Sequence, residues 1–113
     1  ESAMLFYKME DYRASATMLR RTLIEFPDIM EREQLVYLIC KSYFQLAENS
    51  VREKQRERYE EAMKAHDELR EDFPESKYLK ETSTMAEKSK KAMLRIDQED
   101  AENAKNQSLV QNQ

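Results

Sequence analysis

The segment Asp72–Lys80 reads DFPESKYLK, and a similar segment, EFPDIMERE, occupies Glu25–Glu33. The chain has two prolines and no glycine, and each proline lies in one of these segments. Proline lacks the N–H group that a continuing helix needs and disfavours helical geometry in the residue before it, yet it is accepted in the first turn of a helix. Each segment therefore predicts the end of one helix and the start of the next, with the new helices beginning at Asp28 and Glu75.

The two segments belong to a repeat with an offset of 47 residues. At this offset a tyrosine, a phenylalanine and a proline recur, as the pairs Tyr12 and Tyr59, Phe26 and Phe73, and Pro27 and Pro74. Before each proline, apolar residues follow the 3.6-residue spacing of a helix that is buried on one side. Repeated pairs of such helices, none of which can cover its own apolar face, are typical of an α-solenoid.

The pattern favours the tetratricopeptide type of solenoid. Tyr59, Ala62 and Pro74 match its aromatic opening of a helix, its small residue three positions later and its closing proline, and Ser15 takes the place of the alanine in the earlier copy. The composition agrees, because strong helix formers dominate and glycine is absent. We therefore expect an all-α protein, a tetratricopeptide-like α-solenoid of about five antiparallel helices.

The offset of 47 residues exceeds the usual tetratricopeptide period of about 34 residues. We expect the excess in the polar stretch Glu48–Arg58, between one helix and the next. Within this stretch, Asn49 and Ser50 are residue types that end or cap helices.

The domain is expected to cover residues 1–97, as the C-terminal part of a longer protein, because the opening ESAMLFYKM resembles the middle of a helix. Residues 98–113 are polar and include only Leu109 and Val110 as large apolar side chains. Such a segment buries too little apolar surface to hold a fixed position. Its first part is expected to extend the last helix, and its end is expected to be mobile.

The charges exclude several classes of function. The chain mixes 23 acidic with 19 basic residues, for a net charge of −4, so no nucleic-acid-binding or membrane-binding basic face is expected. No glycine loop is available to cradle a phosphate. Cys40, the only cysteine, and His66, the only histidine, are predicted to pack in the structure, with zinc binding or general-base work as the alternative for His66. We predict a non-enzymatic protein without a cofactor.

Aromatic and basic side chains supply the candidate binding residues. Tyr7, Tyr37 and Phe44 are expected either to pack in the core or to face a concave groove that takes a peptide. The basic run at residues 52–58 is either a solvated helix start or a site in which Arg56 and Arg58 present planar guanidinium groups to the carboxylates of a partner protein.

The stretch ENSVREKQRERYEEAMKAHDELREDFPESKYLKE resembles the C-terminal tetratricopeptide units of the BamD family of outer-membrane-protein assembly lipoproteins. The similarity extends from about residue 3 to residue 90, and its most specific part is FPESKYLKE; Ser15 and His66 depart from the commoner residues. The resemblance implies a solenoid at the periplasmic face of the outer membrane, attached only through a lipid anchor outside this fragment. It also implies docking of the periplasmic region of BamA, the barrel subunit, or of accessory lipoproteins. A general tetratricopeptide adaptor that binds a short peptide or a chaperone tail is the alternative.

Overall fold

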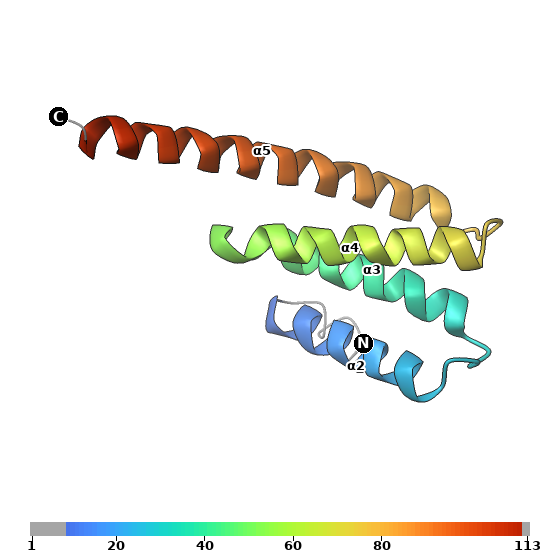
Figure 1. Cartoon of the computed structure of the whole chain (residues 1–113). Coiled ribbons are helices and arrows are strands. Elements are labelled where there is room, and N and C mark those ends of the chain that lie inside the picture. The colour runs from blue at the N-terminus through green and yellow to red at the C-terminus, as the bar shows by residue number, and fades with distance from the viewer. Residues whose placement is uncertain (1–8, 112–113) are drawn as a thin grey trace.

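The computed structural model describes residues 9–111, and all the regular structure in that range is helical. The helices are α2 (Met9–Glu25), α3 (Arg32–Glu48), α4 (Arg52–Asp72) and α5 (Leu79–Gln111) (Figure 1). α3 packs against each of the other three, and α4 also packs against α5. The prediction of an all-α fold is confirmed. The first of the expected helices, with Tyr7, lies outside the described residues.

The two proline turns are built alike. In the first, the amides of Ile29 and Arg32 donate to the carbonyl groups of Phe26 and Ile29, both over 3.1 Å. Each donor and acceptor recurs 47 residues later, with bonds of 3.0 and 3.3 Å. The neighbouring helices share this offset, since residue 72 ends α4 as residue 25 ends α2, and residue 79 begins α5 as residue 32 begins α3. The repeat inferred from the two prolines is therefore confirmed.

The helices that follow the prolines begin later than the sequence predicted. α3 starts at Arg32 rather than Asp28, and α5 starts at Leu79 rather than Glu75. The amides at positions 29 and 32 bond to carbonyl groups three residues back, and an α-helix needs bonds of four residues. The residues after each proline therefore form two successive turns before the helix begins.

The residues expected to fill a long connection extend a helix instead. α3 ends at Glu48 and α4 starts at Arg52, so the connection is only three residues long. Asn49 and Ser50 hydrogen-bond to carbonyl groups in the last turn of α3, which confirms their predicted capping role. The expectation of an insertion between helices is wrong, because the polar run continues the ladder of α4, which reaches 21 residues.

The core lies between the four described helices, and most of its buried side chains belong to α3 and α4. Seven of its side chains have no exposed surface: Val36, Ile39, Cys40, Ala47, Ala62, Ala65 and Leu69. The thiol of Cys40 donates to the carbonyl oxygen of Ala62 over 3.3 Å, and burial raises its pKa to about 12. Cys40 is thus a small buried side chain, as predicted. α3 is buried on several sides, because it contacts every other described helix.

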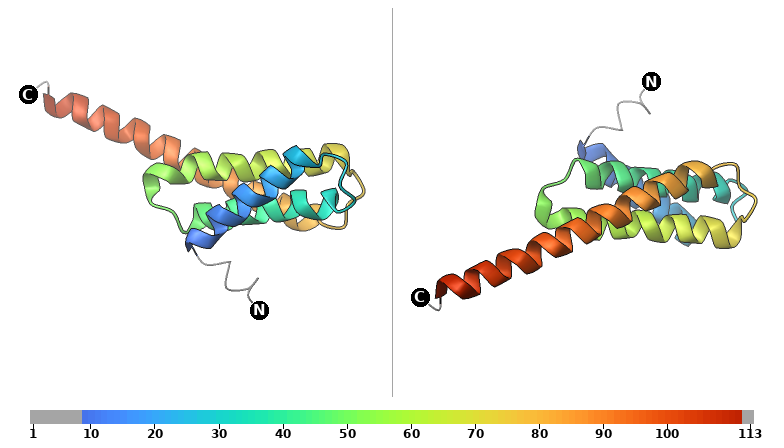
Figure 2. Two further views of the ribbon diagram at one scale, coloured as in Figure 1. Left: turned by 90° about the horizontal axis from the view of Figure 1, so that it is seen from below. Right: turned by 90° about the horizontal axis from the view of Figure 1, so that it is seen from above.

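α5 is the longest described helix, with 33 residues. Ile96 is its last buried side chain, and every side chain from Asp97 to Gln111 is exposed. This distal half extends past the start of α4, away from the other described helices (Figures 1 and 2). The polar residues after position 97 do extend the last helix, while the boundary at residue 97 and the mobility of the chain end stay predictions.

Candidate protein-docking groove

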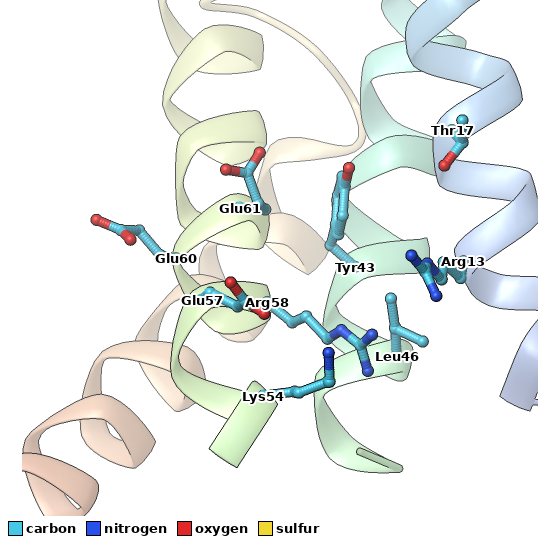
Figure 3. A pocket seen from close by; sticks show the side chains of 9 residues that line it. All are labelled: Arg13, Thr17, Tyr43, Leu46, Lys54, Glu57, Arg58, Glu60 and Glu61. Carbon is cyan, nitrogen blue, oxygen red and sulfur yellow. The ribbon is translucent and has the colours of Figure 1, made fainter. Parts of the chain in front are cut away.

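A groove of about 570 Å³ lies between α2 and α4, with side chains of α3 as its floor (Figure 3). Polar and charged side chains form most of its walls. The residues that line it are Arg13 and Thr17 from α2, Tyr43 and Leu46 from α3, and Lys54, Glu57, Arg58, Glu60 and Glu61 from α4.

The helical period explains why these residues meet. Lys54, Glu57, Arg58 and Glu61 follow the spacing i, i+3, i+4 and i+7, which places them along one face of α4. In α2 the two lining residues are four positions apart, and in α3 they are three apart. Each helix therefore presents one continuous strip of side chains to the groove.

Ion pairs join α2, α3 and α4 near the proline turn. Glu68 of α4 accepts from Arg20 of α2 over 3.0 Å and from Arg32, the first residue of α3, over 2.9 Å. Arg32 also reaches Asp72 over 2.8 Å. The hydrogen bond to Asp72 is the main cause that raises the pKa of Arg32. This network, which we call the turn-end network, holds the three helices together beyond one end of the groove.

The other end of the groove carries three cations without a carboxylate partner. Arg13 and Lys54 form no ion pair within residues 9–111, and Arg58 donates to the hydroxyl of Ser50 instead. In Figure 3 the charged ends of Arg13, Lys54 and Arg58 lie around Leu46. We call these three residues the basic cluster.

Among the carboxylates of the groove, Glu57 lies beside Arg58, whereas Glu60 and Glu61 lie farther from the charged ends of the basic cluster (Figure 3). Glu61 is 3.6 Å from Lys64, an exposed pair within one helix that contributes little to stability. Burial raises the pKa of Tyr43, and the charge of Glu61 adds to this effect. The groove therefore carries charges of both signs, with the basic cluster at one end and Glu61 farther along α4.

The aromatic candidates lie elsewhere. The ring of Tyr37 stacks on Tyr78 with centroids 4.2 Å apart, and its hydroxyl donates to both carboxylate oxygens of Glu81 at 2.9 Å. Phe44 is buried, with its ring centroid 6.2 Å from that of Tyr59. Neither lines the groove between α2 and α4. Their positions fit the core-packing alternative, and a role in binding stays a prediction.

The basic run is divided between two faces of α4. Arg56 donates two hydrogen bonds, of 2.7 and 3.1 Å, to the carboxylate of Asp97 in α5. This bidentate contact lowers the pKa of Asp97. Arg52 reaches Glu99 and Asp100 of the same helix over 2.7 and 2.9 Å. We call these contacts of Arg52 and Arg56 the α5 clamp. The structure thus separates Arg56, which faces α5, from Arg58, which faces the groove.

Sequence reasoning included Lys54 and Arg58 in the basic run but did not connect them with Arg13 or Tyr43. The repeat held a usable signal for Arg13, because this residue follows Tyr12 as Glu60 follows Tyr59. Corresponding helices of neighbouring units lie next to each other in a solenoid. Residues at equal repeat positions, including Arg13 and Glu60, can therefore be expected around a shared groove.

His66 has a structural environment. It is buried, and its Nδ1 atom lies 2.8 Å from the hydroxyl oxygen of Thr82. Burial lowers the pKa of the imidazole. The part of the chain that the structure describes contains no group of three His, Cys, Asp or Glu side chains that could hold a metal ion. None of the described helices is both long enough and apolar enough to cross a membrane.

Stacked helix pairs, a repeated proline turn and a charged groove define a helical-repeat scaffold. A family model described as an outer membrane lipoprotein, YfiO, matches residues 2–106. The chain belongs to this family of outer membrane lipoproteins, which confirms the family indicated by the sequence. Association with the outer membrane is the localisation that the family supports. No curated protein matches the chain.

Proposed function

We propose that the chain is a non-enzymatic docking module of a lipoprotein that helps to assemble β-barrel proteins at the outer membrane. The observation that carries the proposal is the match to an outer membrane lipoprotein family over residues 2–106. By resemblance, the chain corresponds to the C-terminal tetratricopeptide units. Its partners are then the periplasmic region of the barrel subunit BamA or accessory lipoproteins, at the periplasmic face of the membrane.

The groove supports a docking role in physical terms. Its walls belong to helices that share a core and are joined by the turn-end network, so the charged side chains have defined positions before a partner arrives. Fixed charges of both signs select a partner by complementarity and set its orientation. Such a surface suits recognition of another folded protein.

Co-purification tests this function. The full-length lipoprotein, tagged in its native envelope, is solubilised in detergent and purified, with an unrelated outer membrane lipoprotein carrying the same tag as the control. The barrel-assembly subunit should be enriched with this protein and not with the control. Enrichment of a cytosolic chaperone alone would support the peptide-adaptor alternative, and the absence of any specific partner would contradict a docking role.

A further inference from the structure

The charges between α2 and α4 differ from one end of these helices to the other. Near the proline turn, Arg20 of α2 meets Glu68 of α4 over 3.0 Å. Nearer the start of α2, Arg13 lies with Lys54 and Arg58 of α4 around the same groove. The face therefore has opposite charges at one end and like charges at the other.

The like charges are unfavourable as they stand. Cations that line one groove repel one another, and the repulsion is stronger beside protein walls than in bulk water. Lys54 lies in the first turn of α4 and Arg58 in the next, where the positive end of the helix dipole adds to their potential and normally favours acidic residues. No carboxylate within residues 9–111 forms an ion pair with the basic cluster.

The opposite face of α4 shows that the fold can neutralise such cations. Arg52 and Arg56 come from the same basic run, and three carboxylates of α5 satisfy them in the α5 clamp. Lys54 and Arg58 alternate with them in sequence but turn toward the groove. The chain thus pairs the cations of one face internally and leaves those of the other face open to a ligand from outside.

The rest of the groove limits what that ligand can be. Glu57 and Glu61 lie on the same face of α4 as Lys54 and Arg58, with Glu57 beside Arg58 and Glu61 farther from the charged ends of the basic cluster (Figure 3). A nucleic acid or an anionic membrane surface presents continuous negative charge and would be repelled by them. A polypeptide can place an acidic and a basic side chain a few residues apart, so it can complement both parts of the groove.

We propose that the groove binds a polypeptide segment of a docked protein that inserts an Asp or Glu carboxylate into the basic cluster. A cation of the same segment then lies near Glu61. The two guanidinium groups of the cluster can each contact a carboxylate through two N–H groups, and the floor formed by Tyr43 and Leu46 packs against the stem of the inserted side chain. This inference rests on the proposed function and names the chemistry by which the docking occurs.

Site-specific photocrosslinking in the native envelope tests the inference. A benzophenone amino acid replaces Thr17, an exposed and uncharged groove residue, in the full-length protein, and a second protein carries it at the exposed Ser83 of α5 as the matched control. The Thr17 position should crosslink to a polypeptide segment that has Asp or Glu close to the attachment point. Crosslinks to phospholipid alone, or to a segment without an acidic residue, would overturn the inference.

A charge swap makes the test specific for electrostatic contact. Arg58→Glu should lower the Thr17 crosslink yield by about fivefold or more, whereas Arg21→Glu, an exposed change elsewhere on α2, should leave it unchanged. Replacing the crosslinked acidic residue of the partner by Lys should restore the yield with Arg58→Glu. Failure of this rescue would overturn the inference while a co-purified partner upholds the proposed function. If no partner is captured by either assay, the proposed function fails and the inference fails with it.

Discussion

His66 lies in the core between α4 and α5, with 6% of its surface exposed. Its Nδ1 atom is 2.8 Å from the hydroxyl oxygen of Thr82, so the contact links the two helices. Burial is the main cause that lowers the pKa of the imidazole, while the charge of Asp67 opposes the effect and that of Arg70 reinforces it. The folded protein therefore favours the neutral ring over the protonated one.

The buried imidazole predicts a pH dependence of stability. The unfolded chain takes up a proton near pH 6.5, and the folded protein takes it up only at lower pH. The contribution to the free energy of unfolding is thus complete above about pH 6.5 and declines as the pH falls toward the folded pKa. Urea unfolding at a series of pH values between about 5 and 8 should show this decline in the wild-type protein and little of it in His66→Gln.

Asp97 titrates outside this window. The pKa of Asp97 is lowered from 3.8, so the stability linked to its ion pair is present near neutral pH and is lost only in strong acid. An equal decline in the wild-type protein and in His66→Gln would show that His66 is not the group responsible.

At the scale of elements, the distal half of α5 depends on few contacts. Its side chains beyond Ile96 are exposed, and an isolated helix of about 15 residues is only marginally stable in water. The α5 clamp attaches the start of this half to the first turns of α4. The clamp is exposed to solvent, so salt should weaken it.

Loss of the clamp should loosen α5 locally without unfolding the domain. In Arg56→Ala, amide hydrogen exchange at residues 97–111 should become about threefold faster or more, with the melting temperature unchanged within about 2 °C. Arg70→Ala is the matched control, because it removes an exposed ion pair within α4 and should leave the exchange of α5 unaltered. Hydrogen exchange resolved by fragment checks both variants. Unchanged exchange in Arg56→Ala would contradict this prediction, because it would show that the distal half of α5 stays helical without the clamp.

At the scale of the whole molecule, the repeat made the fold predictable. Two prolines and an offset of 47 residues were enough to predict helix pairs joined by equivalent turns, because proline acts on the backbone locally and apolar spacing decides which face is buried. The predicted helix starts at Asp28 and Glu75 were wrong because turn bonds of three residues compete closely with helical ones. The polar stretch Glu48–Arg58 was expected to lie between helices, whereas its residues 52–58 form the solvated helix start that was one of the two alternatives for the basic run.

The groove was less predictable than the fold. Arg56 and Arg58 are two positions apart, so a helix turns them to different faces, and only the position of α5 shows that Arg56 is already paired with Asp97. Arg13 is far from both in sequence and meets Arg58 only because α2 and α4 flank α3. Such a cluster depends on helix packing angles, which periodicity does not give.

Complementation in the native bacterium tests most directly whether this scaffold serves barrel assembly through its groove. The full-length lipoprotein is depleted and replaced by a variant in which Arg13, Lys54 and Arg58 are all changed to Glu. The matched control reverses three exposed cations outside the groove, Arg21, Lys90 and Lys91, and so has the same net charge. The measured quantity is the amount of folded β-barrel protein in the outer membrane, with the helical circular dichroism of each variant confirming its fold.

The groove variant should fold, yet it should support at least about fivefold less folded barrel protein than the wild type. The control variant should support the wild-type level. If the folded groove variant sustains the wild-type level of barrel protein, the groove has no role in barrel assembly and the central claim is contradicted.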